Sequence, residues 1–251
     1  NFVKAMVFAA GYGERLRPMT ERLPKALIRV AGRPVIEYSL LLLRHHGIRE
    51  IIINLHHLGE KIQEHLKDGK KLGLNITYSE EKKLLDTGGG LLKARPFLAD
   101  GAFLVINSDV IIDLPLTDLL DQHRKRGGIA TLVLRSDPQA DLYGAIETSA
   151  DLRIQKFLAH KAPRSESAGT LTKYMFTGVQ VLEPKVFDYM EPAGASAKFS
   201  TTKITYPRML TQGEKLYAFP FRGYWQDLGT SERITEAEEK LKRGEVKLHY
   251  L

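Results

Sequence analysis

The chain has 251 residues, of which 43% are hydrophobic and 27% are charged, which suits a protein with one sizeable packed core. It contains no cysteine, and this excludes disulfides, thiolate metal sites and cysteine nucleophiles. The net charge of +7 is compatible with nucleic acid, a membrane surface or an anionic substrate. Because the Lys and Arg residues are scattered, with no polybasic run between aromatics, we expect neither a nucleic-acid nor a membrane partner.

The first 135 residues alternate between apolar and amphipathic segments. Strands are expected at residues 3–9, 50–55, 73–79, 102–109 and 129–135, and helices at 34–46, 58–69, 89–98 and 116–128. Pro34 suits the first turn of a helix, and Gly47 suits a C-terminal cap. This alternation predicts an α/β fold with a mostly parallel, mixed sheet that helices cover on both faces.

From about residue 137 the pattern becomes rich in strands. Strands are expected at residues 143–148, 153–158 and 174–182, and a loop at 159–170. Helices near 184–190 and 201–212 follow, and the strands at 215–221 and 223–229 are expected to close the sheet. Thr230 is expected to cap a last helix, 231–244, with Glu232 in its first turn.

The N-terminal segment FVKAMVFAA lacks a long apolar core followed by a cleavage site, so we expect no signal peptide. The densest apolar run, YSLLLL, is too short to cross a bilayer. These observations favour a cytoplasmic protein.

The stretch VFAAGYGERLRPMTERLPKALI, residues 7–28, carries the strongest functional signal. A dinucleotide-binding fingerprint would need glycine where Leu16 stands, and no Gly-Lys-Ser/Thr triplet of a P-loop follows a strand. Gly11 and Gly13 permit backbone N–H groups to approach phosphate oxygens, and Arg15 and Lys25 supply cations. The pattern therefore favours a glycine loop closed over a nucleoside triphosphate. The alternative is a plain strand–loop–helix turn with solvated cations.

Two acids follow apolar strands far downstream of this loop. Asp109 ends one strand, and Asp227 follows Trp225 near the end of another. Ligands of open α/β sheets bind at the carboxyl ends of strands, and carboxylate oxygens suit Mg²⁺. Spacing alone does not show that the two acids meet, and each alone is compatible with a strand-end acid held by a turn.

The opening stretch resembles the signature of the sugar-1-phosphate nucleotidyltransferases. DTGGGL resembles the base-binding loop of that family, NSDV its metal-binding strand end, YGAIE and FTGVQVL its sugar-side strands, and YWQDLGTSERITEAE its closing metal motif. These motifs span nearly the whole chain in the expected order. Among family members, short N-acetylmuramate-1-phosphate uridylyltransferases and mannose-1-phosphate guanylyltransferase-like enzymes are most similar.

The resemblance implies a Rossmann-like nucleotidyltransferase (nucleotide-diphospho-sugar transferase) fold. It implies a single domain, 1–251, with a nucleotide-binding half (1–135), a sugar-binding half (136–229) and a C-terminal helix (230–251). It also implies Arg15 and Lys25 as catalytic residues, and Asp109 and Asp227 as ligands of Mg²⁺. The residues implied to bind the nucleotide are Ala10, Gly11, Gly13, Glu14, Arg15, Lys25, Thr87 and Gly88, and those implied to bind the sugar phosphate are Asn107, Gly144, Lys161 and Gly178.

The implied reaction joins a nucleoside monophosphate, with UTP favoured as its source, to a sugar-1-phosphate and releases pyrophosphate. Thr87 and Gly88 are also compatible with a helix-capping turn, and Gly144 and Gly178 with strand bulges. Where relatives carry Glu-Lys-Pro, this chain has His160, Lys161, Ala162 and Pro163, so the sugar stays open. The oligomeric state is open as well.

Other functions compete with this interpretation. One is a phosphocholine-type cytidylyltransferase, against which the DTGGGL loop argues. Another is a catalytically silent regulatory protein that senses nucleotide sugars, which should have lost a catalytic cation or a metal-binding acid. The histidine pairs His45–His46 and His56–His57 are expected to be surface or cap residues without a role, because adjacent side chains point to different faces.

Overall fold

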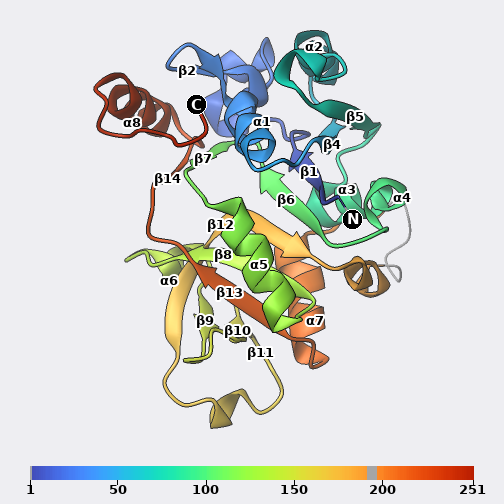
Figure 1. Ribbon diagram of the computed structural model, residues 1–251, viewed down its shortest axis with the longest axis vertical. Helices are drawn as coiled ribbons and strands as arrows, with labels where there is room; N and C mark the ends of the chain where they lie inside the picture. Colours follow the sequence, from blue (N-terminus) through green and yellow to red (C-terminus); the bar gives the residue numbers. More distant parts are fainter. Residues whose placement is uncertain (1, 191–196) are drawn as a thin grey trace. The chain divides into compact units, whose positions relative to one another are not determined.

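The computed structural model describes residues 2–190 and 197–251 (Figure 1). The chain forms two compact units that interleave along the sequence. The first unit comprises Asn1–Leu84, Ile106–Leu114 and Gly223–Leu251, and the second comprises Leu85–Val105 and Pro115–Arg222. Strand β6 (Phe103–Asn107) belongs to the second unit at its start and to the first unit at its end.

Parallel strands form the sheet of the first unit. β1 (Lys4–Phe8) pairs with β4 (Glu50–Leu55), and β4 pairs with β5 (Asn75–Glu80), both in parallel register. Helices α1 (Val35–His45) and α2 (Gly59–Leu66) connect these strands. The run EIIINL of β4 is buried except at its first residue, as expected for a strand with both faces covered. The repeated strand–helix–strand pattern therefore gives the parallel sheet that the sequence predicts.

The first unit also contains two small antiparallel ladders. β2 (Arg29–Val30) pairs with β3 (Arg33–Pro34), and β7 (Val110–Ile112) pairs with β14 (Trp225–Asp227). Strand β14 was expected to close the main sheet, but it pairs with β7 instead. The sequence analysis missed β7 because its three apolar residues follow β6 too closely to stand out as a strand. Helix α8 (Ser231–Lys242) follows, and the Thr230 side chain accepts a hydrogen bond from the N–H of Arg233, as predicted.

The second unit has a mixed sheet. Its strands are β8 (Ala130–Arg135), β9 (Ile146–Thr148), β10 (Ile154–Phe157), β11 (His160–Lys161), β12 (Thr172–Leu182) and β13 (Leu216–Pro220). The order β11–β10–β9–β12–β8 is antiparallel throughout, whereas β8 and β13 are parallel. Short turns join β9 to β10 and β10 to β11, and such connections permit only antiparallel pairing. The predicted α/β fold with a mixed sheet is confirmed, and the first unit carries most of its parallel pairing.

The helices of the second unit are α3 (Asp86–Lys93), α4 (Arg95–Leu98), α5 (Leu116–Arg126), α6 (Ala140–Tyr143) and α7 (Tyr206–Thr211). The expected helix at 201–212 is a π-helical turn, Thr201–Thr205, that continues into α7, and the one at 184–190 is a 3₁₀ helix, Pro184–Tyr189. The expected loop at 159–170 contains β11. No helix among the described residues combines the length and apolarity that crossing a bilayer requires.

Several buried polar groups of the second unit are hydrogen-bonded to one another. The Gln180 amide donates to the Val105 carbonyl at 2.7 Å and accepts from the Tyr206 hydroxyl at 3.0 Å. Burial raises the pKa of the Tyr206 hydroxyl, which therefore stays a neutral donor. His123, which is 2% exposed, contacts Thr131 Oγ1 and Glu183 Oε1 through its two ring nitrogens. Such paired groups fix which side chains face the core.

Candidate active site

The glycine loop leaves β1 and is held by the first unit itself. The N–H of Ala9 donates to Asn54 Oδ1 of β4 at 2.8 Å, which fixes the start of the loop. Gly13 has a φ of +64°, and a Cβ there would stand 2.8 Å from Thr20 Cγ2 and 3.2 Å from Lys25 Cβ. Only glycine fits this position without displacement. At Gly11 a Cβ would meet nothing within 4 Å, so the protein's own packing does not require that glycine.

Two histidines after β4 hold the same loop from outside. His56 Nδ1 donates to the Glu81 carbonyl at 2.6 Å, and its Nε2 accepts from the Tyr12 hydroxyl at 2.8 Å. His57 Nε2 donates to the Thr20 carbonyl at 2.6 Å. The sequence analysis gave these histidines no role. Their partners lie in loops and could not be identified from the periodicity of the segment that contains them.

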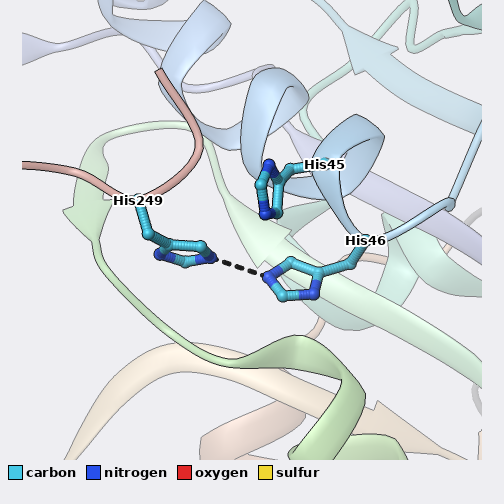
Figure 2. A group of neighbouring side chains, drawn as sticks. All are labelled: His45, His46 and His249. Carbon is cyan, nitrogen blue, oxygen red and sulfur yellow. Dashed lines mark hydrogen bonds between the residues drawn. The ribbon is translucent and has the colours of Figure 1, made fainter.

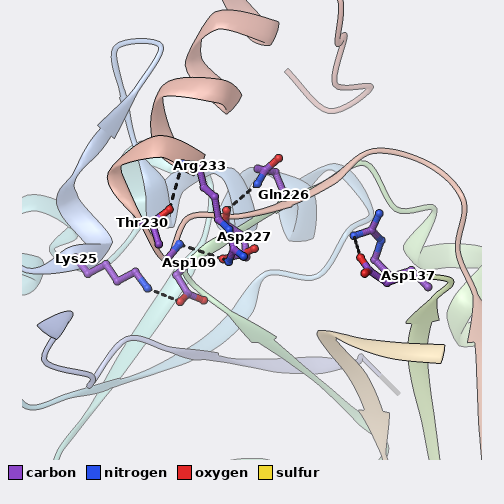
Figure 3. A network of polar contacts seen from close by, with 9 residues as sticks. Lys25, Asp109, Asp137, Gln226, Asp227, Thr230 and Arg233 are labelled. Atoms are coloured by element: carbon purple, nitrogen blue, oxygen red, sulfur yellow. Dashed lines mark hydrogen bonds and ion pairs between the residues drawn. The ribbon is translucent and has the colours of Figure 1, made fainter. Parts of the chain in front are cut away.

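Lys25 of this loop forms an ion pair with the first of the two predicted acids. Lys25 Nζ donates to Asp109 Oδ2 at 2.6 Å, and the two side chains are 19% and 35% exposed (Figure 3). A pair that is this short and only partly solvated is positioned by the fold, unlike a typical mobile surface ion pair. The glycine loop and the end of β6 therefore meet at one charged site.

The ladder between β7 and β14 brings the second acid to the same place. Asp227 pairs in register with Val110, the neighbour of Asp109, and the N–H of Leu228 donates to the Asp109 carbonyl at 2.9 Å. Asp109 and Asp227 thus lie at one end of a two-stranded ladder, although 118 positions separate them in the sequence. The sequence could not establish this proximity.

Arg233 is a further cation at this site. Its guanidinium donates to Asp227 Oδ1 (Figure 3). The same oxygen also accepts from the N–H of Gly229 at 3.2 Å. Arg233 follows the Thr230 cap in the first turn of α8 and is 32% exposed. The sequence analysis missed this residue. The signal that could have identified it is its place in the sequence: Arg233 comes three residues after the helix cap Thr230, which itself closely follows the strand-end acid Asp227.

Arg15 approaches Asp227 from the glycine loop. A Cβ placed on Gly229 would stand 2.9 Å from Arg15 Nη2 and 3.0 Å from Asp227 Oδ1. The guanidinium of Arg15 and the carboxylate of Asp227 therefore lie around the same point, and Gly229 leaves room for both. Four predicted residues, Arg15, Lys25, Asp109 and Asp227, are thus gathered within the first unit.

The donor set of this site fits a hard divalent cation. Asp109 and Asp227 each present carboxylate oxygens, which are the ligands that Mg²⁺ prefers. Each carboxylate forms an ion pair with a basic side chain: Asp109 with Lys25, and Asp227 with Arg233. The negative charges of the two acids are therefore balanced within the protein. No sulfur or imidazole ligand is among these contacts, which fits magnesium better than zinc.

The remaining predicted residues of the first unit flank this group. Ala10 is buried and Gly11 and Glu14 are exposed on the loop. Asn107 ends β6 two positions before Asp109, is partly exposed, and its carbonyl accepts from the Ser39 hydroxyl at 3.4 Å. Their roles in binding stay predictions.

Thr87 and Gly88 belong to the second unit, in the first turn of α3. The Thr87 hydroxyl accepts from the N–H of Thr201 at 2.9 Å, and the N–H of Gly88 donates to the Phe199 carbonyl at 2.9 Å. A Cβ on Gly88 would stand 2.2 Å from the Phe199 ring. Packing against Phe199 therefore explains why glycine is present at position 88. That Thr87 and Gly88 contact the nucleobase stays a prediction. Thr87 lies inside α3, so the alternative that it caps the helix is wrong.

Gly144 and Gly178 occupy positions of positive φ, +90° and +87°. A Cβ on Gly144 would stand 2.2 Å from Leu158 Cδ2. The register of β12 against β8 shifts between Phe176 and Gln180, which places Gly178 at a bulge. Both glycines have a backbone reason to be present, and their contact with a sugar stays a prediction.

Lys161 lines a hollow of about 300 Å³ in the second unit. Its charged and polar lining residues are Glu147, Lys156, Lys161, Ser165 and Glu166. Lys156 Nζ and Glu147 Oε2 lie 4.0 Å apart in this hollow. Although His160 replaces the acid expected beside Lys161, the hollow contains carboxylates from elsewhere in the chain.

The pattern of the nucleotidyl transferase family matches residues 4–244, and the chain belongs to this family. It is 35% identical over 240 residues to the UTP–glucose-1-phosphate uridylyltransferase of Synechocystis sp., covering 90% of this chain and 60% of that enzyme. It is 36% identical over 244 residues to the N-acetylmuramate alpha-1-phosphate uridylyltransferase of Neisseria meningitidis, covering 94% of this chain and 97% of that enzyme. The chain therefore spans about three fifths of some curated relatives and nearly the full length of another.

Solved structures share the fold. A putative glucose-1-phosphate thymidylyltransferase from Bacillus anthracis superposes with a TM-score of 0.76 at 22% identity, covering 94% of both chains. A UDP-glucose pyrophosphorylase complexed with UDP-glucose superposes with a TM-score of 0.77 at 17% identity, covering 97% of this chain and 100% of that one. The predicted nucleotide-diphospho-sugar transferase fold and the predicted family are both confirmed.

Proposed function

We propose that this chain transfers a nucleoside monophosphate from a nucleoside triphosphate to a sugar-1-phosphate and releases pyrophosphate. The observation that carries the proposal is the gathering of Lys25, Asp109 and Asp227 beside the glycine loop. Transfer of a phosphoryl group depends mainly on positioning and on neutralising charge, and this site offers cations and carboxylates that are held in ion pairs.

In the proposed reaction an oxygen of the sugar-1-phosphate attacks the α-phosphorus of the triphosphate. A new phosphorus–oxygen bond forms, and the bond from the α-phosphorus to the bridging oxygen of pyrophosphate breaks. The attacking oxygen is already anionic near neutral pH, so no general base is required. Lys25 neutralises charge that develops at the α-phosphate, and Arg15 stabilises the leaving pyrophosphate.

Asp109 and Asp227 are the residues that would hold Mg²⁺. When bound, this ion supplies positive charge to the phosphate oxygens. In the protein alone, Asp109 fixes the Lys25 ammonium, and Arg233 fixes the carboxylate of Asp227. This preorganisation lowers the cost of ordering charged side chains when substrate binds.

We propose UTP as the nucleotide, because two relatives that are 35% and 36% identical are uridylyltransferases. A mannose-1-phosphate guanylyltransferase subunit of Drosophila melanogaster is 32% identical over 232 residues, so GTP is the competing nucleotide. Within the second unit, Thr87 and Gly88 are proposed to contact the base, and Gly144, Lys161 and Gly178 the sugar phosphate. From the first unit, Asn107 is proposed for the sugar phosphate as well. A cytoplasmic location and the absence of nucleic-acid or membrane partners stay predictions.

The test is pyrophosphate release in the presence of Mg²⁺, measured for UTP, dTTP, GTP and CTP against a panel of sugar-1-phosphates. Lys25→Ala and Asp109→Asn are expected to lower the rate by about 100-fold or more, because each removes half of a preorganised charge pair. Lys70→Ala is the matched control, since it breaks the exposed ion pair of Lys70 with Asp68.

Release with one nucleotide and one sugar-1-phosphate, lost in both site variants and kept in the control, would support the proposal. No release with any pair, together with binding of nucleotide sugars, would favour the silent sensor. A Lys25→Ala protein as fast as the wild type would contradict the role of this lysine.

A further inference from the structure

Three histidines of the first unit form a cluster that the proposed transferase reaction does not use. His45 ends helix α1, His46 follows it, and His249 comes from the C-terminal segment (Figure 2). One ring nitrogen of each lies within 4.8 Å of the others. His46 and His249 are 203 positions apart, so the sequence analysis, which considered only the adjacent pair, could not find this arrangement.

The expectation that adjacent histidines point to different faces does not hold here. His45 is the last residue of α1, whereas His46 has a φ of −92° and a ψ of +16°, outside the dihedral angles of the helix. The chain therefore turns between them, and their ring centroids lie 5.1 Å apart. His249 meets both rings, with centroid separations of 4.9 and 5.1 Å.

A carboxylate orients the third histidine. Asp113, which directly follows β7, accepts hydrogen bonds from the backbone N–H of His249 at 3.1 Å and from its ring Nδ1. The Nδ1 atom of His249 therefore carries a proton, and its Nε2 atom faces His46 Nε2. This carboxylate–histidine contact is the arrangement that orients imidazole ligands of metal ions in proteins.

The spacing of two ring nitrogens inside the cluster is also close to that of two ligands of one metal ion. His249 Nε2 and His46 Nε2 lie 2.9 Å apart, a distance at which one proton is shared between the two nitrogens. Two nitrogens bound to one tetrahedral Zn²⁺ lie about 3.3 Å apart at ordinary bond lengths. A small outward rotation of either ring would let a metal ion replace the shared proton.

The electrostatic surroundings favour a cation. The cluster lies at the C-terminal end of α1, where unpaired carbonyl groups create a partial negative charge. Asp113 adds a full negative charge behind His249. His45 and His249 are solvent-exposed, so an ion can enter and its fourth coordination position can hold water.

From these contacts we propose that His45, His46 and His249, oriented by Asp113, bind one divalent transition-metal ion of the Zn²⁺, Co²⁺ or Ni²⁺ type. Three imidazole nitrogens suit these ions and do not suit Mg²⁺, so this site differs in chemistry from the carboxylates Asp109 and Asp227. The ion would fasten the C-terminal segment, which already buries Leu248 and Tyr250, to the end of α1.

The test is a titration of the chelator-treated full chain with Zn²⁺, followed by calorimetry in excess Mg²⁺ that occupies carboxylate sites. We expect one ion per chain in the wild type. His249→Gln is expected to weaken binding by about 100-fold or more, and Asp113→Asn by about 10–100-fold, as for other orienting carboxylates. His65→Gln is the matched control, because His65 is a histidine of the same unit that contacts Glu37 and lies outside the cluster.

Two further measurements separate metal binding from loss of folding. The Co²⁺-loaded wild type is expected to show the intense visible absorption of a low-coordinate nitrogen site, and the His249→Gln protein is expected to lose it while keeping its far-ultraviolet circular dichroism. At the same Zn²⁺ concentration, the melting temperature is expected to rise more for the wild type and for His65→Gln than for His249→Gln or Asp113→Asn. The proposal is overturned if the wild type binds no stoichiometric Zn²⁺, if half an ion binds per chain, or if His65→Gln loses as much affinity as His249→Gln.

Discussion

Gly229→Ala offers the sharpest test of the proposed active site, because it adds one methyl group between two of its charged side chains. The new Cβ would stand 2.9 Å from Arg15 Nη2 and 3.0 Å from Asp227 Oδ1. Favourable contacts of carbon begin at about 3.5 Å, so each group must retreat by roughly half an ångström or more. Both atoms end flexible side chains, so the backbone can stay in place.

The expected result is a loss of activity without a loss of stability. Misplacing a reacting group by about 1 Å can cost about 100-fold in rate, so we expect kcat/KM for pyrophosphate release to fall by about 10–100-fold. Replacing glycine by alanine at an unstrained position stabilises by about 0.4–1 kcal/mol through the unfolded chain, so the free energy of unfolding should change by no more than about 1 kcal/mol. Steady-state kinetics and urea unfolding measure the two quantities.

Gly101→Ala is the control, since a Cβ there would meet nothing within 4 Å. If the methyl group acts through Arg15, then Arg15→Ala and the double variant Arg15→Ala/Gly229→Ala should have the same rate. A Gly229→Ala protein with wild-type kcat/KM and wild-type stability would refute the reasoning, because it would show that the reaction does not depend on the observed position of the Arg15 guanidinium.

Three other changes test the structure elsewhere. Gly88→Ala forces a methyl group to within 2.2 Å of the Phe199 ring and is expected to cost about 1–3 kcal/mol, measured as a lower urea midpoint; unchanged stability would show that Phe199 can move freely. Thr230→Ala removes the cap of α8 and is expected to cost about 1 kcal/mol, whereas Thr230→Ser should cost little; equal losses would contradict the capping bond. The hydrogen bond from the Ser149 hydroxyl lowers the pKa of the Asp151 carboxyl in the folded protein. This contact therefore stabilises the fold fully above the unfolded-state pKa of about 4, and the stabilisation is lost as pH falls through the lower folded-state pKa. Ser149→Ala should raise the pKa of Asp151 in an NMR titration, and an unchanged pKa would exclude the hydroxyl as its cause.

Local sequence determined most elements of this fold. The buried runs of β1 and β4, the mostly buried α1, the amphipathic α5 and the Thr230 cap of α8 follow from local patterns of apolar residues and from capping preferences that act within a few residues. The requirement for glycine at position 13 could also be predicted, because a tight loop after a strand needs a residue that tolerates positive φ. Family motifs then indicated which acids and cations to consider.

Only the tertiary structure decided which of these residues meet. The pairing of β7 with β14 places Asp109 beside Asp227, and β7 itself was too short to predict from its pattern. The hydrogen bond from the backbone N–H of His249 to the Asp113 carboxylate likewise joins residues 136 positions apart. Contacts of this kind depend on strand pairing and on the docking of the C-terminal segment, and a pattern confined to neighbouring residues carries no information about either.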